Sequence, residues 1–288
     1  MPELPEVETI RRDLAHAVVG RAITAVEWLD ARIVRGDVEG AELAARMVGR
    51  QGAAVARRGK FLVWRFTSGE GLLLHLGMSG RLTVGPRSDE AWPRHTHLVV
   101  ALSSGAVVRL VDPRRFGRVA WLAAPAAGPG GMGPEPLSPR FTAESLGRIL
   151  AGRRAPIKAV LLDQRRVAGL GNIYVDEALF RARLHPARPA GSLGAREVGA
   201  LHRAIRRVLR DALADRGTTF MDYRDAHGQR GEHAAHLGVY GRAGQPCRRC
   251  GAPIVRVVVA ARGTHLCARC QPAGAHGGSD TEVSGRRG

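Results

Sequence analysis

The first residues of the chain, MPELPEVET, include groups that a purely structural role does not explain. Pro5 suits the first turn of a helix, where its missing N–H costs nothing, and Glu6 suits the positive end of the helix dipole. Pro2 and Glu3 precede that helix, so a helix start does not account for them. A chain end is usually frayed and chemically irrelevant. The two residues therefore raise the hypothesis that this chain end is the active site.

The cysteines form a second group with chemical potential. Cys247, Cys250, Cys267 and Cys270 read C-x2-C-x16-C-x2-C, which is spacing typical of a four-cysteine zinc site. Two disulfides in a secreted domain are the alternative, but the chain start is acidic and has no apolar signal region. Since protein thiolates fill all four positions, we expect one structural Zn²⁺. The stretches PIVRVVV and GTHL between the pairs predict a β-hairpin with Arg262 at its basic tip.

The basic residues point to a polyanionic partner. The chain has 44 Lys and Arg against 26 Asp and Glu, a net charge of +18. Such an excess favours nucleic acid, although a generally basic solvated surface is the alternative. Only Lys60 and Lys158 are lysines. Because lysine is a point charge with an adaptable pKa and arginine is not, both lysines are functional candidates, with composition bias as the alternative.

The elements that must position these groups change along the chain. Val7, Ile10, Leu14 and Val18 fall at helical spacing. From about Ala22 to Ala124 the pattern predicts short strands: AITAVEWL, KFLVWRF, GLLLHLG, THLVVALS and AVVRLV, with a hairpin turn at Ser103–Gly105. Beyond a segment rich in Pro and Gly, helices are expected at about 141–150, 156–163, 173–182 and 195–215.

We therefore predict an α+β protein. Residues 1–125 form a β-sandwich with a leading helix, 126–139 a linker, and 140–235 a helical region that ends in a long mobile loop. Residues 236–271 form the zinc hairpin, and 272–288 a disordered tail. No apolar run is long enough to cross a membrane. We expect a cytoplasmic monomer.

Together, these stretches resemble the bacterial formamidopyrimidine-DNA glycosylases and the wider group that includes endonuclease VIII. The matching motifs are MPELPEVET, RRGKF, HLGMSGRL, VDPRRFG, GPEPLS, GLGNIYVDEALF, LHP and VYGRAGQPCRRCG, in the family's order over nearly the whole chain. The resemblance implies a helix–two-turn–helix around GLGNIYVDEALF and a double-stranded DNA substrate that contains a damaged base. It also implies excision of oxidised purines followed by β,δ-elimination.

The resemblance also implies the roles of individual residues. Pro2 becomes the nucleophile after removal of Met1, Glu3 acts as the general acid, and Lys60 and Arg262 assist elimination at the phosphates. Met78 and Phe116 wedge into the gap left by the flipped base, and Arg114 meets the orphaned partner base. Asn172 and Lys158 hold phosphates, with His95 and Arg154 as further DNA contacts.

Several alternatives stay open on the sequence alone. The chain could be an endonuclease VIII-like enzyme for oxidised pyrimidines, although Arg114 and Phe116 argue against it, or a non-catalytic protein that binds damaged DNA. Lys60 could be the nucleophile, since lysine also forms Schiff bases. His95 and His97 could bind a metal, but no third ligand is evident.

Overall fold

In the computed structural model, residues 2–87, 91–123, 129–220 and 222–273 are described. The chain divides into two compact units: residues 1–130 with 212–234, and residues 131–211 with 235–288. The sequence assigned 212–234 to the helical region, whereas its contacts group it with the first unit. The boundaries at 125 and 139 stay predictions, and almost all of the predicted tail lies outside the described residues.

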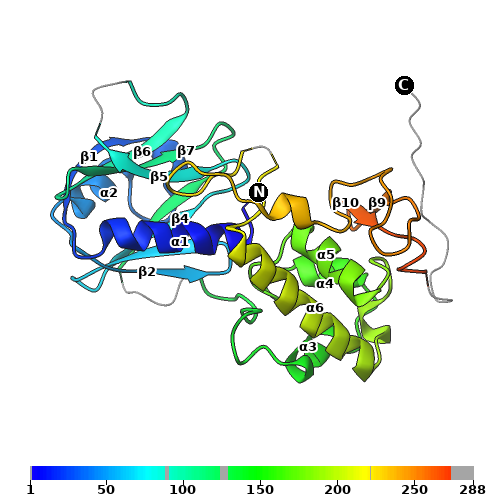
Figure 1. Ribbon diagram of the computed structural model, residues 1–288. Coiled ribbons are helices and arrows are strands. Elements are labelled where there is room, and N and C mark those ends of the chain that lie inside the picture. The colour runs from blue at the N-terminus through cyan, green and yellow to red at the C-terminus, as the bar shows by residue number, and fades with distance from the viewer. Residues whose placement is uncertain (1, 88–90, 124–128, 221, 274–288) are drawn as a thin grey trace. The chain divides into compact units, whose positions relative to one another are not determined.

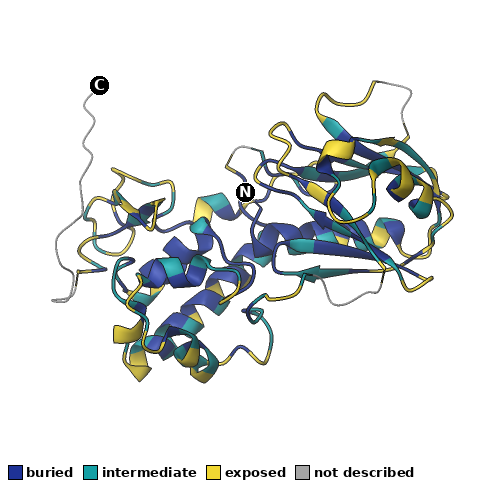
Figure 2. Cartoon of the chain, turned by 180° about the vertical axis from the view of Figure 1, so that it is seen from behind, coloured by how far each residue is buried: buried dark blue, intermediate teal, exposed yellow. Residues whose placement is uncertain are grey.

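The first unit begins with α1 (Leu4–Val18), which carries Pro5 in its first turn. Val7, Ile10, Leu14 and Val18 are at most 1% exposed, as the helical spacing predicted. Figure 2 shows α1 dark along most of its length, and α1 packs on β2 (Gly52–Arg58). The helix that follows the chain start is therefore fixed inside the unit.

Two antiparallel four-stranded sheets form the rest of the first unit (Figure 1). One has the order β1 (Ile23–Leu29), β6 (Thr96–Leu102), β7 (Ala106–Val111), β5 (Arg81–Pro86). The other has the order β2, β3 (Phe61–Phe66), β4 (Gly71–His75), β8 (Arg118–Leu122). Buried residues of both sheets and of α1 belong to one apolar core, which confirms the predicted β-sandwich with a leading helix.

The structure adds elements that the sequence pattern did not predict. These are β2, β5, β8, the helix α2 (Gly40–Met47) and the short 3-10 helix η1 (Ala31–Ile33). β2 reads GAAVARR, and alanine and glycine are poor strand formers, so its pairing with β3 rather than propensity decides its structure. The β6–β7 hairpin was predicted correctly, with Gly105 at φ +83° in its turn.

The second unit holds the predicted helices. They are α3 (Ala143–Leu150), α4 (Ile157–Leu162), α5 (Asn172–Ala182) and α6 (Ala195–Ala214), the last of which runs on into the first unit; η2 (Ala190–Ser192) precedes α6. In the turn between α4 and α5, Gly169 has φ +86°, as a tight turn requires. Gly171 is extended and forms the N-cap of α5. The Gln164 side chain holds the turn by accepting from Gly169 N and donating to Leu170 O.

The zinc hairpin is also present. β9 (Val255–Val259) pairs with β10 (Arg262–Leu266), and the turn residues Ala260 and Ala261 both have positive φ. The Glu177 carboxylate of α5 accepts three backbone N–H groups from residues 238–240, which ties α5 to the segment that leads into the hairpin. Burial raises the pKa of Glu177 against these three hydrogen bonds.

The stretch after Gly217 forms a loop, as predicted. In its described residues, regular structure is limited to an isolated bridge between Thr218 and Glu232 and the short 3-10 helix η3 (His233–His236). Across the part of the chain that the structure describes, no helix combines the length and apolar character that a membrane crossing requires.

Candidate active site

The start of the described chain is ordered by side chains from within the first unit. Pro2 is buried, and Glu3 is 2% exposed at the N-cap of α1. The Glu6 carboxylate accepts Glu3 N at 2.8 Å through one oxygen and Thr218 N at 2.8 Å through the other. Glu6 thereby joins the chain start to the loop that follows α6. The bond to Glu3 N completes a capping box, as a helix start requires, and the bond to Thr218 N goes beyond that role.

A second set of contacts holds the same loop along α1. The Arg216 guanidinium donates to Asp13 at 2.7 Å and to Asp225 at 2.7 Å, and these two carboxylates are almost fully buried. Tyr223 packs into the sandwich core, where burial and the nearby Glu6 charge raise the pKa of its hydroxyl. The sequence did not reveal Asp13, Arg216 and Asp225, because side chains this far apart in sequence give no local pattern.

Lys60 lies in the tight turn between β2 and β3 and is only 7% exposed. Gly59 precedes it with φ +56°, which is a conformation that glycine accepts readily. Burial, together with the nearby cations Lys60 and Arg118, lowers the pKa of His75 to about 4. His75 is therefore neutral near pH 7, and its Nδ1 accepts a hydrogen bond from Gly77 N.

Two loops bring the three predicted gap-filling residues of the first unit to neighbouring positions. A Cβ on Gly77 would stand 2.5 Å from the Phe116 backbone, so only glycine permits this approach. The approach places Met78 in the loop that packs against Phe116. Met78 and Phe116 are 39% and 51% exposed, and the Arg114 guanidinium lies 6.0 Å from the Phe116 ring. Large apolar side chains that are exposed together beside a guanidinium are typical of a binding surface.

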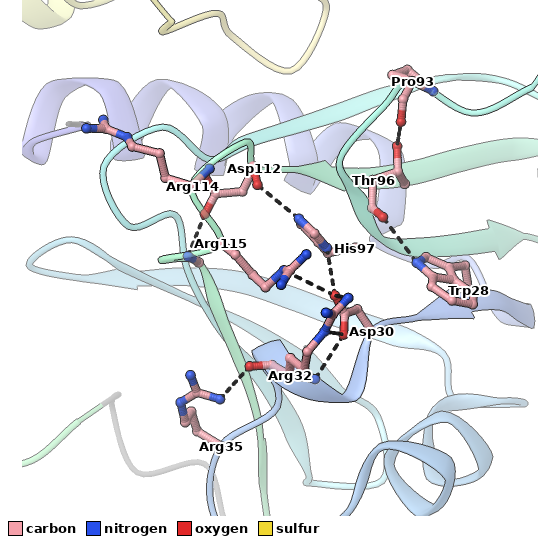
Figure 3. A network of polar contacts seen from close by, with 11 residues as sticks. Trp28, Asp30, Arg32, Arg35, Pro93, Thr96, His97, Asp112, Arg114 and Arg115 are labelled. Atoms are coloured by element: carbon pink, nitrogen blue, oxygen red, sulfur yellow. Dashed lines mark hydrogen bonds and ion pairs between the residues drawn. The ribbon is translucent and has the colours of Figure 1, made fainter.

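A buried carboxylate fixes the loop that carries Arg114. Asp112 is 0% exposed; its Oδ2 accepts Gly117 N at 2.7 Å and its Oδ1 accepts the Ser79 hydroxyl. Ser79 in turn accepts from Arg114 Nε at 3.2 Å. Figure 3 shows the Arg114 side chain pointing away from the network in which Arg115 reaches Asp30.

The two histidines before β6 and at its start have different environments. His95 is exposed with φ +68°, and its carbonyl accepts Asp112 N. His97 is buried and bonds Asp30 and the Asp112 carbonyl, as Figure 3 shows. No possible metal cluster among the described residues includes either histidine.

In the second unit, the predicted phosphate contacts fall into exposed and buried classes. Arg154 and Arg262 are exposed. Asn172 is the first residue of α5, one position before the expected helix start, and its Nδ2 donates to Gly263 O at 2.9 Å. Lys158 is 0% exposed and its Nζ lies 2.6 Å from Asp176 Oδ1. The lysine that was expected to contact phosphate is therefore enclosed by protein groups in this structure.

The four cysteines converge as the spacing predicted. Their sulfur atoms all lie within 4.8 Å of one another, with Cys247–Cys270 at 4.0 Å and Cys250–Cys267 at 3.5 Å. Zn–S bonds of about 2.3 Å in a tetrahedron place sulfur atoms about 3.8 Å apart, so these thiols fit one zinc ion. No ligand position is left open, and the zinc is therefore structural.

This β-sandwich, helical body and four-cysteine hairpin define the class of helix–two-turn–helix DNA glycosylases. Three family models match the chain. They are the formamidopyrimidine-DNA glycosylase N-terminal domain at residues 1–119, the formamidopyrimidine-DNA glycosylase H2TH domain at 132–223, and the zinc finger found in FPG and IleRS at 244–273. The chain belongs to the formamidopyrimidine-DNA glycosylase family.

Individual relatives agree with this assignment. The formamidopyrimidine-DNA glycosylase of Symbiobacterium thermophilum is 51% identical, over 94% of this chain and 90% of that protein. The crystal structure of the MutM (Fpg) protein from Thermus thermophilus has a TM-score of 0.84 at 43% identity, covering 95% of this chain and all of the other. A Lactococcus lactis Fpg in complex with DNA containing FAPY-dG has a TM-score of 0.87 at 33% identity, covering 94% and 100%.

Proposed function

We propose that this protein is a bifunctional DNA glycosylase and AP lyase of base excision repair. It excises oxidised purines, namely formamidopyrimidines and 8-oxoguanine opposite cytosine. The observation that carries the proposal is the chain start: Pro2 is buried, Glu3 is 2% exposed, and Glu6 bonds the Glu3 N–H and Thr218. Most chain ends fray unless they are tied down, and this one is tied down at a buried pair of carboxylates.

Pro2 supplies the covalent chemistry once Met1 is removed. Its secondary amine attacks C1′ of the damaged nucleotide, the bond from C1′ to the base breaks, and the proton of the amine passes to the departing base. Glu3 protonates the sugar ring oxygen, the ring opens, and an iminium joins Pro2 to C1′. The iminium acidifies the C2′ proton, whose loss expels the 3′ phosphate. A second elimination then expels the 5′ phosphate.

The other residues hold the DNA in place for these steps. Lys60 and Arg262 contact the phosphates at the lesion and assist elimination. Met78 and Phe116 fill the space that the flipped base leaves, which fits their exposure, and Arg114 meets the partner base.

Further phosphate contacts complete the DNA interface. His95 and Arg154, both exposed, and Asn172 contribute to it. The protein acts as a cytoplasmic monomer on double-stranded DNA.

The test is borohydride trapping on a duplex that carries 8-oxoguanine opposite cytosine, followed by peptide mapping of the cross-link. We expect the cross-link at Pro2. Pro2→Gly should abolish the cross-link that the wild-type protein forms, and Lys60→Ala should leave that cross-link intact. A cross-link at Lys60 would assign the nucleophile to the lysine. Tight binding without any cross-link, on this duplex and on one with an abasic site, would contradict the enzymatic proposal.

A second candidate function is excision of oxidised pyrimidines by the same chemistry. Arg114 favours the purine assignment, because a guanidinium can donate to the acceptor atoms of cytosine, the partner of guanine lesions. Single-turnover excision of 8-oxoguanine opposite cytosine and of an oxidised pyrimidine opposite adenine separates the two candidates.

A further inference from the structure

A buried hydroxyl stands between Lys158 and Arg262. Lys158 Nζ donates to Thr264 Oγ1 at 2.8 Å, and Thr264 Oγ1 donates to the Arg262 carbonyl oxygen at 2.9 Å. Thr264 is 0% exposed. A hydroxyl has one proton, and an ammonium can only donate. The ammonium therefore forces the Thr264 proton toward Arg262.

The ammonium is itself fixed by α5. Asp176 Oδ1 accepts from Lys158 Nζ at 2.6 Å, and Asp176 Oδ2 accepts the backbone N–H of His265 at 2.8 Å. Both side chains of this ion pair are 0% exposed. One carboxylate thus binds the cation and also the strand that contains Thr264.

The hairpin residues after Arg262 are consequently held one by one. Gly263 O accepts from Asn172 Nδ2, Thr264 from Lys158, and His265 N donates to Asp176. The Arg262 side chain remains exposed beyond this fixed backbone. The backbone around Arg262 is therefore held by hydrogen bonds, while its guanidinium is exposed.

We propose that Lys158, Asp176 and Thr264 form a positioning relay for Arg262 in the second elimination. This inference rests on the proposed function, because the task of Arg262 belongs to it. Lys158 then acts through Thr264 and the Arg262 backbone, rather than as a phosphate ligand. Such positioning matters, because a displacement of about 1 Å at a reacting centre can cost about 100-fold in rate.

The test uses the full-length, zinc-loaded protein with Thr264→Val, Thr264→Ser and Arg262→Ala, on a duplex with 8-oxoguanine opposite cytosine. Single-turnover gels follow the β-elimination and β,δ-elimination products separately, and borohydride trapping reports Schiff base formation. Thr264→Val keeps the shape of the side chain and removes the relay. We expect it to slow the second elimination about tenfold, with trapping unchanged, and Thr264→Ser to restore the wild-type product ratio.

A matched control separates the relay from the stability of the hairpin. Val257 pairs with Thr264 across the hairpin, so Val257→Ala perturbs the same place without touching the relay. It should leave the product ratio unchanged at equal zinc content. If Thr264→Val gives the wild-type ratio, or if both variants slow the second elimination equally, the relay is overturned.

Two further outcomes are distinguishable. If Thr264→Val loses its zinc, Asp176→Asn is tested instead, because it retains the shape of the side chain but weakens its bond to Lys158. A slowed second elimination in Asp176→Asn supports the relay, and a wild-type rate overturns it. If the wild-type protein excises no base, the proposed function fails, and if Arg262→Ala yields wild-type products, the role given to Arg262 fails. The relay then falls with it, for a reason visible without any Thr264 variant.

Discussion

The two arginines that the proposed function places at the DNA, Arg114 in the first unit and Arg262 in the second, are both supported through a hydroxyl and a buried aspartate. In the first unit, the Arg114 guanidinium itself donates to Ser79, which donates to Asp112. In the second unit, Thr264 accepts from Lys158 and donates to the backbone carbonyl of Arg262 rather than contacting its guanidinium. Among the described residues, no partner of the Arg262 guanidinium is found.

This difference fits the two tasks. A residue that discriminates one partner base needs a guanidinium of fixed direction, because bidentate recognition depends on geometry. A residue that stays in contact with phosphates through two eliminations needs a fixed backbone and a guanidinium that can move. The comparison indicates that side-chain support matches the precision that each contact requires.

The two lysines also differ in their surroundings. Lys60 lies close enough to His75 to lower the pKa of that imidazole, whereas Lys158 is paired with Asp176 in full burial. The charge of Lys158 is thus compensated inside the protein. Lys158 is therefore poorly placed to attract a phosphate directly.

Zinc removal should have a larger effect than any substitution, and it should affect the second unit while leaving the first unit folded. Structural zinc contributes on the order of 10 kcal/mol to the folding of small zinc modules, and the hairpin is a sheet of only two strands, β9 and β10. After chelation, we expect β9 and β10 to lose hydrogen-exchange protection, while β6 and β7 keep theirs. Mass-spectrometric hydrogen exchange measures both. Added zinc should restore the hairpin, and equal loss in the sandwich would contradict the independence of the two regions.

Lys158→Met should have the next largest effect. It leaves the Asp176 carboxylate buried without its cation, which typically costs about 3–5 kcal/mol. The free energy of unfolding from urea titration measures it. Arg207→Met is the matched control, because the Arg207–Asp211 pair is on the surface and should contribute at most about 0.5 kcal/mol. Similar losses in the two variants would show that the buried pair has no special role.

The sequence predicted local patterns better than the long-range contacts that support them. The four cysteines, the chain start and the α5 start were predictable because each is a local pattern with one dominant chemical explanation. β2 was not, since GAAVARR has little strand propensity and its pairing with β3 decides its structure. The family resemblance assigned Lys158 to phosphate, and the sequence could not show that this side chain is buried. Its partner Thr264 lies 106 positions away, where no spacing rule applies.

His75 should make the stability of the first unit depend on pH. Its pKa is about 4 in the folded protein against about 6.5 when unfolded, so the unfolded chain binds the proton first. The contribution is complete above pH 6.5 and is lost as the pH falls toward 4, by up to about 3 kcal/mol. Urea titrations of wild type and His75→Asn between pH 7.5 and 4.5 measure it, with the exposed His16→Asn as control. An equal pH slope in all three proteins would contradict the environment assigned to Lys60 and His75.

Phe116→Ala should have the smallest effect on stability and still impair function. The side chain is 51% exposed, so its removal should change the free energy of unfolding by no more than about 0.5 kcal/mol. As a wedge in DNA, however, it should contribute about tenfold to single-turnover excision, because the unstacked duplex loses its apolar filler. Val258→Ala is the matched control: Val258 is 62% exposed on β9 and has no proposed wedge role, so both measurements should stay at wild-type values. If Phe116→Ala also excised at the wild-type rate, exposure of this ring would reflect only surface composition, and the first unit would have no wedge at this position.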